Sequence, residues 1–324
     1  MVDLRINIGK LKLKNPVMVA SGTFGYAEEF KDFINLKKLG AIVTKTITLN
    51  PREGNPPPRT CETPAGMLNS IGLENPGIDK FIEEKLPVLK KIGVPIITSI
   101  ASEDDPKEFI ELSRQLDRLK EVAAIELNIS CPNIHRLQST VHSPQRKDKN
   151  YGLSTTDYRL IAQDAKATYE LVRKVRRVTH KTLITKLSPN VTDIREIAIA
   201  AEASGSDAVS LVNTLTALAI DINERRPKLA GITGGLSGPA IRPIALRMVW
   251  EVYQKIKIPI IGMGGIIDTP NALEFFIAGA TAISIGTANF INPTISVEII
   301  KGIKKYLQEN NINSINKLTG SIKC

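Results

Sequence analysis

The sequence predicts a (β/α)8 barrel that occupies residues 1–324 as a single domain. Eight short apolar segments recur along the chain, and each is followed by a segment with the spacing of an amphipathic helix. Strands this apolar are typical of a parallel sheet that is covered on its faces, and eight strand–helix units in 324 residues fit one closed barrel. A doubly wound open sheet is the alternative that this pattern leaves open. The expected barrel strands are 17–20, 41–46, 95–100, 124–131, 183–188, 208–213, 259–265 and 282–288.

The segments outside these strands also have recognisable patterns. Residues 4–13 alternate around Gly9, which predicts a hairpin ahead of the barrel. Residues 157–178 form an amphipathic run, and residues 194–203 end just before Gly205, a typical helix stop.

Two connections are too long to be simple turns. Residues 48–76 are rich in Pro, Gly and Asn, and residues 134–156 are polar and basic. Each follows an expected strand at its C-terminal end, where long loops usually form lids or ligand walls.

The composition excludes several classes of protein. Hydrophobic residues make up 42% and charged residues 23% of the chain, as in ordinary globular proteins. No apolar run approaches the ~20 residues of a membrane span, and the first ten residues lack the apolar core of a signal peptide, so we expect no membrane association and a cytoplasmic location. Cys61, Cys131 and Cys324 are far apart and form no CxxC pair, so neither a disulfide framework nor a metal or iron–sulfur site is expected.

The net charge of +10 has several possible meanings. The basic residues are spread along the chain, with no basic block beside exposed aromatic residues, so a nucleic-acid partner is not expected. A solvated surface, an anionic small ligand or an acidic protein partner remains possible.

The segment 124–133, AIELNISCPN, predicts a strand that runs into a reactive turn. Pro132 ends the strand pairing, so Cys131 would lie at the C-terminal end of the strand, where parallel α/β folds bind ligands. Asn128 lies on the opposite face from its apolar neighbours and needs a hydrogen-bond partner there. The alternative is that Cys131 is a small buried hydrophobe in a polar turn.

Other expected strands end in polar residues that could join this site. The second strand ends in Lys45 and Thr46, the fifth contains Lys186, and the sixth ends in Asn213 and Thr214. A lysine in an apolar strand is costly to bury without a partner, so the pair favours contact with an anionic or electron-rich ligand. Each lysine alone could instead extend its ammonium to the surface.

Glycines follow the last two strands. Gly264 and Gly265 end the seventh strand, and Gly286 with Thr287 ends the eighth, which is the common phosphate position in barrels. The pattern lacks the third, helix-opening glycine of a dinucleotide fingerprint. A third cluster, 234–238, could add an amide to the same ligand or could be a flexible turn.

Several segments together resemble the catalytic subunit of class 1B dihydroorotate dehydrogenase over nearly the whole chain. They are ASGTFG (20–25), GMLNSIGLENPG (66–77), ELNISCPN (126–133), KLSPNVTDI (186–194), VNT (212–214), ITGGLSGPAI (232–241), IIGMGG (260–265) and GTANF (286–290). The resemblance implies an FMN enzyme that oxidises (S)-dihydroorotate to orotate in pyrimidine (UMP) biosynthesis. A class 2 enzyme would have a serine base and an N-terminal membrane-associating extension, which this sequence does not show.

The resemblance also implies roles for particular residues. Cys131 is implied as the base that removes the C5 proton while hydride leaves C6 for the flavin N5. Substrate contacts are implied for Lys45, Asn69, Ser70, Ile71, Gly72, Leu73, Asn128, Asn133, Asn213 and Thr214. Flavin contacts are implied for Ser21, Gly22, Lys45, Thr46, Ser99, Asn128, Lys186, Val212, Gly238, Gly264, Gly265, Gly286 and Thr287, with Ser99 standing where the family usually has an asparagine.

Class 1B catalytic subunits pair with a second subunit that carries FAD and a 2Fe–2S cluster. The resemblance therefore implies a homodimer at the core of a heterotetramer, with electrons leaving through the partner. Two other activities remain open: an FMN barrel that acts on another dihydropyrimidine, and a flavin-binding scaffold without catalysis.

Overall fold

The computed structural model describes residues 2–103, 105–130 and 161–323. Eight parallel strands close into a barrel, with the neighbour order β10-β15-β16-β3-β4-β7-β8-β9. The predicted barrel is confirmed, and the open-sheet alternative is wrong. The barrel strands are β3 Val17–Val19, β4 Ala41–Val43, β7 Ile96–Ile100, β8 Val122–Leu127, β9 Thr182–Lys186, β10 Ala208–Leu211, β15 Ile260–Gly262 and β16 Ala282–Ile285.

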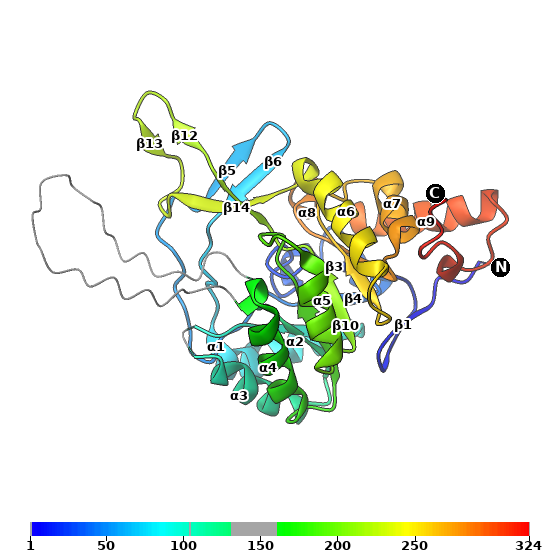
Figure 1. The fold of residues 1–324 in the computed structure, drawn as a ribbon, viewed down its shortest axis with the longest axis horizontal. Helices are drawn as coiled ribbons and strands as arrows, with labels where there is room; N and C mark the ends of the chain where they lie inside the picture. Colours follow the sequence, from blue (N-terminus) through cyan, green and yellow to red (C-terminus); the bar gives the residue numbers. More distant parts are fainter. Residues whose placement is uncertain (1, 104, 131–160, 324) are drawn as a thin grey trace, which may run out of the picture.

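The termini lie on the same side of the molecule (Figure 1). Asp3 forms a parallel bridge with Ser314, so the first and last described segments are joined. No helix in the described ranges is long and apolar enough to cross a membrane.

The predicted N-terminal hairpin is present. Strands β1 Ile6–Ile8 and β2 Leu11–Leu13 pair antiparallel, and Gly9 between them has a φ of +55°, which favours glycine. The amide of Lys10 donates to Thr182 Oγ1 over 3.1 Å. Because Thr182 begins β9, the hairpin covers the N-terminal end of the barrel and leaves the C-terminal end for the site.

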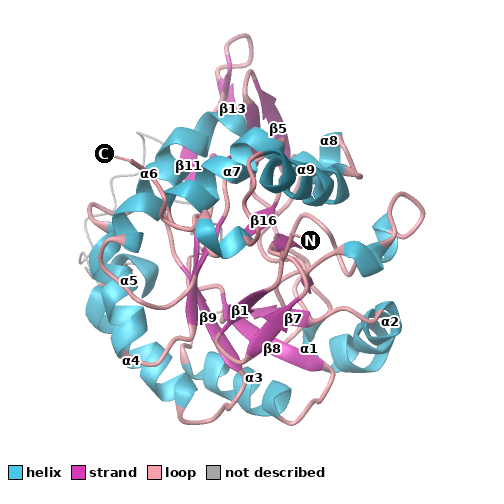
Figure 2. Cartoon of the chain, turned by 90° about the vertical axis from the view of Figure 1, so that its right-hand side faces the viewer, coloured by secondary structure: helices cyan, strands magenta, loops and turns pink. Residues whose placement is uncertain are grey.

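The helices lie outside the strands (Figure 2). Those of the described part are α1 Gly77–Lys80, α2 Leu86–Ile92, α3 Lys107–Asp117, α4 Ala165–Arg176, α5 Ile194–Ala203, α6 Arg242–Tyr253, α7 Thr269–Ala278, α8 Ala288–Ile291 and α9 Ile295–Glu309. A π-helical turn, Phe81–Lys85, joins α1 to α2.

Helix α5 has the predicted bounds. Its N-cap Asp193 accepts from the amide of Arg195, and the hydrogen bond from the Arg195 guanidinium lowers the pKa of Asp193 to about 2. Helix α4 begins later than predicted, at Ala165, because the side chain of Asp164 caps it by accepting from the amide of Ala167.

The first strand is not followed by the expected helix. Only two short 3-10 turns, Glu28–Phe30 and Leu36–Lys38, follow β3. Gly25 and Ala27 both have positive φ, which interrupts a right-handed helix at this point.

A second sheet stands over the C-terminal end of the barrel, and we call it the mouth sheet. It has the order β11-β14-β6-β5, with the bounds β5 Thr60–Thr63, β6 Gly66–Asn69, β11 Leu215–Leu218 and β14 Thr233–Ser237. A small hairpin, β12 Ile220–Asp221 with β13 Arg226–Pro227, projects beyond it (Figure 1). The reading of residues 234–238 as a flexible turn is therefore wrong, because most of this cluster forms the end of β14.

Candidate active site

The hydroxyl of Thr46 is the centre of a hydrogen-bond network at the barrel mouth. Its Oγ1 lies 2.9 Å from Ser21 Oγ and 3.0 Å from Ser99 Oγ, and it accepts from Asn128 Nδ2 over 3.1 Å. These residues follow or end the strands β3, β4, β7 and β8, so one oxygen ties together the ends of four neighbouring strands. Thr46, Ser99 and Asn128 are all buried.

The network continues across the mouth to Asn213. Asn128 Oδ1 accepts from Ser130 Oγ at 3.2 Å and from Asn213 Nδ2 at 3.4 Å, and Asn213 Nδ2 also reaches Ser130 Oγ at 2.9 Å. Asn213 Oδ1 accepts from the amide of Thr214. The structure therefore brings together five of the residues predicted from separate strands: Ser21, Thr46, Ser99, Asn128 and Asn213.

Two lysines face this end of the barrel. Lys186, the last residue of β9, is 5% exposed, and Lys45 is half-buried next to Thr46. Neither ammonium has a hydrogen-bond or ion-pair partner among the described residues. A buried ammonium in this state needs a counter-charge or a polar ligand.

Glycines lie at the ends of β15 and β16, and those after β15 are closely packed. Gly264 and Gly265 have φ values of +122° and +73°. A Cβ at Gly265 would lie 2.8 Å from the carbonyl oxygen of Gly238, so the loop after β14 packs directly on the end of β15. Val212 belongs to the same corner, since its amide donates to Met263 and its side chain would lie 3.5 Å from a Cβ at Gly264.

The surface at the end of β16 is less crowded. A Cβ at Gly286 would have only ordinary contacts, 3.8 Å from Ala20 and 3.9 Å from Thr23, and one at Gly22 would have no neighbour within 4 Å. Thr287 precedes α8 as its cap residue. This end therefore leaves room for a ligand group beside the backbone, as a phosphate requires.

The loop 70–73 is held by its own backbone. The amide of Ser70 donates to Arg59 O, the Ile71 carbonyl accepts from the amide of Asn55, the Gly72 carbonyl accepts from Arg52 Nε, and the Leu73 carbonyl accepts from Asn75 Nδ2. Asn55 Nδ2 also donates to Ser70 Oγ over 2.9 Å. The predicted substrate loop is thus an ordered wall.

Asn69 connects this wall to the mouth sheet. Its Nδ2 donates to the carbonyl of Gly235 over 3.2 Å, and a Cβ at Gly235 would lie only 2.0 Å from Thr214 Oγ1. Asn69, Gly235 and Thr214 are therefore stacked at one edge of the site. The predicted base Cys131 and the predicted substrate residue Asn133 lie outside the described residues.

The sequence reasoning did not single out two residues that the structure places in this network. Ser130 is fully buried between Asn128 and Asn213, and Asn190 donates to Ser188 Oγ and to the Thr214 carbonyl. Both follow barrel strands within polar motifs, so a polar residue just beyond a strand end is the signal that could have identified them.

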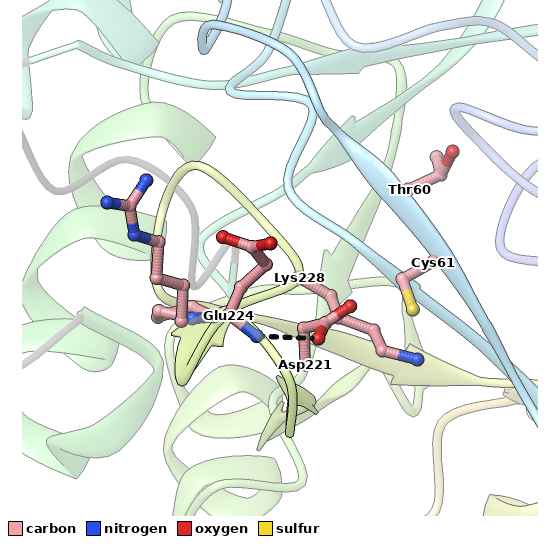
Figure 3. Close-up of a pocket in the computed structure, with 7 residues that line it drawn as sticks. Thr60, Cys61, Asp221, Glu224 and Lys228 are labelled. Atoms are coloured by element: carbon pink, nitrogen blue, oxygen red, sulfur yellow. Dashed lines mark hydrogen bonds between the residues drawn. The ribbon is translucent and has the colours of Figure 1, made fainter.

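A cavity of about 420 Å³ lies away from this network, between β5 and the β12–β13 hairpin (Figure 3). Cys61, Asp221, Glu224 and Lys228 are among its lining residues. Cys61 is partly exposed here, and its thiol donates to the Glu62 carbonyl at 3.3 Å. In the described part of the chain, no group of histidine, cysteine and acidic side chains could hold a metal ion.

The fold and the polar mouth define a class of protein: a (β/α)8 barrel of the enzyme type, with amides, hydroxyls and glycines at the C-terminal end, where barrel enzymes bind their ligands. Comparison with known families identifies the group within that class. The dihydroorotate dehydrogenase family model matches residues 3–307, and the chain belongs to this family.

Several curated relatives cover nearly the full length. The chain is 50% identical over 320 residues to the dihydroorotate dehydrogenase B (NAD(+)), catalytic subunit, of Geotalea uraniireducens, covering 99% of this chain and 98% of that protein. Proteins of the same name from Geotalea daltonii and Thermoanaerobacter pseudethanolicus are 51% and 49% identical, over 99% of this chain and 98% and 99% of their own lengths. The family expected from the sequence motifs is confirmed.

Proposed function

We propose that this chain oxidises (S)-dihydroorotate to orotate in UMP biosynthesis, with FMN as its cofactor. The observation that carries the proposal is the amide–hydroxyl network of Thr46, Asn128, Ser130 and Asn213 at the barrel mouth. A pyrimidine ring has alternating donors and acceptors in one plane, and side-chain amides offer both kinds of group. Family membership and the name of the relatives support the same reaction.

The residues present fit FMN. The glycine backbone at Gly286 has room for a phosphate, and Lys186 is a buried cation without a partner among the described residues. When bound, FMN supplies the acceptor for the hydride of the substrate. The chain's part is to bind and orient both molecules. The proposed FMN contacts are Ser21, Gly22, Lys45, Thr46, Ser99, Asn128, Lys186, Val212, Gly238, Gly264, Gly265, Gly286 and Thr287.

The proposed substrate site lies between the network and the loop 70–73. Asn69, Asn128, Asn133, Asn213 and Thr214 would hold the ring, and Lys45 would contribute a positive charge beside it. Loop 70–73 is anchored by Asn55 and would cover the ring and exclude water.

The proposed base is Cys131, which would remove the proton from C5 of dihydroorotate. Its neighbour Ser130 is tied to Asn128 and Asn213, the two asparagines proposed to hold the ring. A general base must lie within hydrogen-bond reach of the proton it removes, and a position in the sequence next to ring-binding residues supports this assignment.

The proposed electron acceptor is a separate subunit. The relatives are named catalytic subunits of an NAD(+) enzyme, which implies a second subunit for electron transfer. We propose that this partner carries FAD and a 2Fe–2S cluster and that two copies of this single-domain chain form the core of a heterotetramer. A cytoplasmic location and the lack of a nucleic-acid partner remain predictions.

An anaerobic reduction experiment tests the proposal. The purified chain, loaded with FMN, is mixed with dihydroorotate or with dihydrouracil, and flavin absorbance is followed. We expect the flavin to bleach with dihydroorotate but not with dihydrouracil. Bleaching with dihydrouracil instead would indicate another dihydropyrimidine as substrate, and tight FMN binding without bleaching by either would indicate a non-catalytic scaffold.

A further inference from the structure

Two charged residues are buried inside the barrel. Among the described residues, Glu126 and Lys186 are the only buried side chains with a formal charge, at 2% and 5% exposure. They lie on the neighbouring strands β8 and β9 and carry opposite charges. Burying a lone charge is costly, so two opposite charges in one interior are expected to compensate each other.

Both side chains point into the barrel. Asn128 faces the interior because it bonds to Thr46 and Asn213 across the mouth, and Glu126, two residues earlier on the same strand, faces the same way. Ser210 Oγ donates to Glu126 Oε2 over 3.0 Å, which requires both groups to be inside. Lys186 is the register neighbour of Ser210 and therefore shares its face.

This geometry brings the carboxylate in front of β9, the strand that carries Lys186. Glu126 lies on β8 and Ser210 on β10, so their hydrogen bond crosses the interior in front of β9. Neighbouring strands lie about 4.8 Å apart, so a carboxylate bonded to Ser210 lies about one strand spacing from the base of the Lys186 side chain.

Each member of the pair has free capacity. Glu126 Oε1 is buried without a hydrogen-bond partner in the described part of the chain, and Oε2 accepts from Ser210, so the carboxylate and the Lys186 ammonium are not in direct contact in this structure. Lys45, which is half-buried, is a second positive charge that the described residues place at this mouth. Glu126 is therefore the negative charge available to Lys186 from the described barrel strands.

We infer that Glu126 is a positioning residue that acts through Lys186. Its carboxylate is the buried counter-charge that helps to direct the Lys186 ammonium toward the mouth. Glu126 also offsets part of the positive charge that a flavin at the mouth would meet. This last step rests on the proposed function, whereas the pairing of Glu126 with Lys186 does not.

A double-mutant cycle on the cofactor-free chain tests the pairing. Glu126→Gln, Lys186→Met and the double variant are compared with the unmodified chain by denaturant unfolding. Each single change leaves one buried charge uncompensated. The folding equilibrium constant of the double variant should therefore be about tenfold larger than the value expected from adding the two single destabilisations. If either single variant fails to fold, folding of the double variant supports the pairing, and its failure overturns it. Additive effects also overturn it.

The flavin potential tests the second part of the inference. With FMN bound, Glu126→Gln removes a negative charge near the flavin and should raise its midpoint potential. We expect a shift of about tenfold in the reduced-to-oxidised ratio, which is about 30 mV for a two-electron couple. Glu126→Asp keeps the charge and should restore most of the potential, and an unchanged potential in folded Glu126→Gln contradicts the role.

Thr98→Val is the matched control for both measurements. Thr98 is a buried polar residue whose hydroxyl has no partner in the described part, and it lies on the opposite face of β7 from Ser99, outside the barrel interior. The Thr98→Val variant should leave the flavin midpoint potential unchanged, and its effect on stability should be additive with that of Lys186→Met. A chain that does not bind FMN contradicts the proposed function and leaves the stability cycle readable. If dihydroorotate reduces the bound flavin but the effects in the double-mutant cycle are additive, only this inference is contradicted.

Discussion

The side-chain amide of Asn128 donates to the hydroxyl of Thr46 over 3.1 Å, and this bond joins the end of β8 to the residues that follow β4. Both residues are 5% exposed. The same hydroxyl also meets Ser21 and Ser99, so its loss would leave several buried polar groups without a partner.

Thr46→Val should lower the free energy of unfolding by about 1–3 kcal/mol, the usual cost of unsatisfied buried polar groups. Denaturant unfolding of the cofactor-free chain measures the change. Thr46→Ser keeps the hydroxyl and serves as the control. A Thr46→Val variant as stable as the unmodified chain would show that the network contributes nothing to stability.

Gly286→Ala should weaken FMN binding without destabilising the chain. The added Cβ has only ordinary contacts within the protein, but it occupies the surface proposed for the phosphate. We expect at least about a tenfold loss of affinity, or about 1.4 kcal/mol. Fluorescence titration of FMN measures the affinity, and thermal unfolding of the cofactor-free variant is the control. An unchanged affinity for FMN would show that the phosphate does not bind at Gly286.

Asn55→Ala should raise the KM for dihydroorotate more than it lowers kcat. Asn55 donates to both the carbonyl and the hydroxyl of Ser70, and its own amide is bonded to Ile71, so it anchors the predicted substrate loop. Losing the two side-chain bonds is expected to cost about 1.4 kcal/mol, or about tenfold in KM. Steady-state kinetics measure the split. Asn50→Ala is the matched control, because Asn50 is exposed and its side chain bonds to no described residue; an equal effect of both variants would rule out a specific anchor.

Asp117→Ala should destabilise the chain at neutral pH and have a smaller effect in acid. Burial raises the pKa of Asp117, but hydrogen bonds from the Thr179 hydroxyl and from the amides of His180 and Lys181 outweigh it and bring the pKa below its usual 3.8. A lowered pKa means that the carboxylate stabilises the fold above about pH 4 and that this contribution is lost as the pH falls through the lowered value.

The expected cost of Asp117→Ala at pH 7 is about 1–3 kcal/mol, measured by denaturant unfolding. The same measurement at pH 3 should show a smaller difference. A difference that stays constant over this range would mean that packing, rather than charge, makes Asp117 stabilising.

Cys131→Ala should slow flavin reduction by dihydroorotate by about 10²–10⁴-fold, the usual contribution of a positioned base. A thiol of ordinary pKa, ~8.5, acts best as the thiolate, so reduction should become faster with rising pH in the unmodified chain. Stopped-flow absorbance measures both effects. Cys61→Ala should reduce normally, because Cys61 lies at the separate cavity beside β5. Full activity of Cys131→Ala would reject the assignment.

The barrel could be predicted from the sequence because its strands are apolar and each is followed by a local helical pattern or a turn. Helix α5 was predicted with its observed bounds because its apolar spacing is local and Gly205 marks its C-terminal end; the structure adds Asp193 as its N-cap. The segment after β3 was predicted wrongly as a helix. The positive φ of Ala27 interrupts it, and alanine is not a residue type that indicates a positive φ in a sequence.

The mouth sheet could not be predicted. Its strands are short and half-exposed, β6 and β14 contain glycine, and these two strands pair over a large separation in the sequence. No local pattern encodes such a partner. In the site, the polar residues at strand ends were predictable, but the convergence of Ser21, Ser99 and Asn128 on one hydroxyl depends on barrel closure.

The ladder between β6 and β14 joins two excursions of the chain whose contact at Asn69 and Gly235 spans 166 residues. The first excursion continues into the loop that would cover the substrate, and the second carries the backbone that presses on Thr214. Moving one excursion without the other would break this ladder, so the two segments are mechanically coupled at the mouth. Compensating substitutions between homologues should accordingly appear in both excursions together.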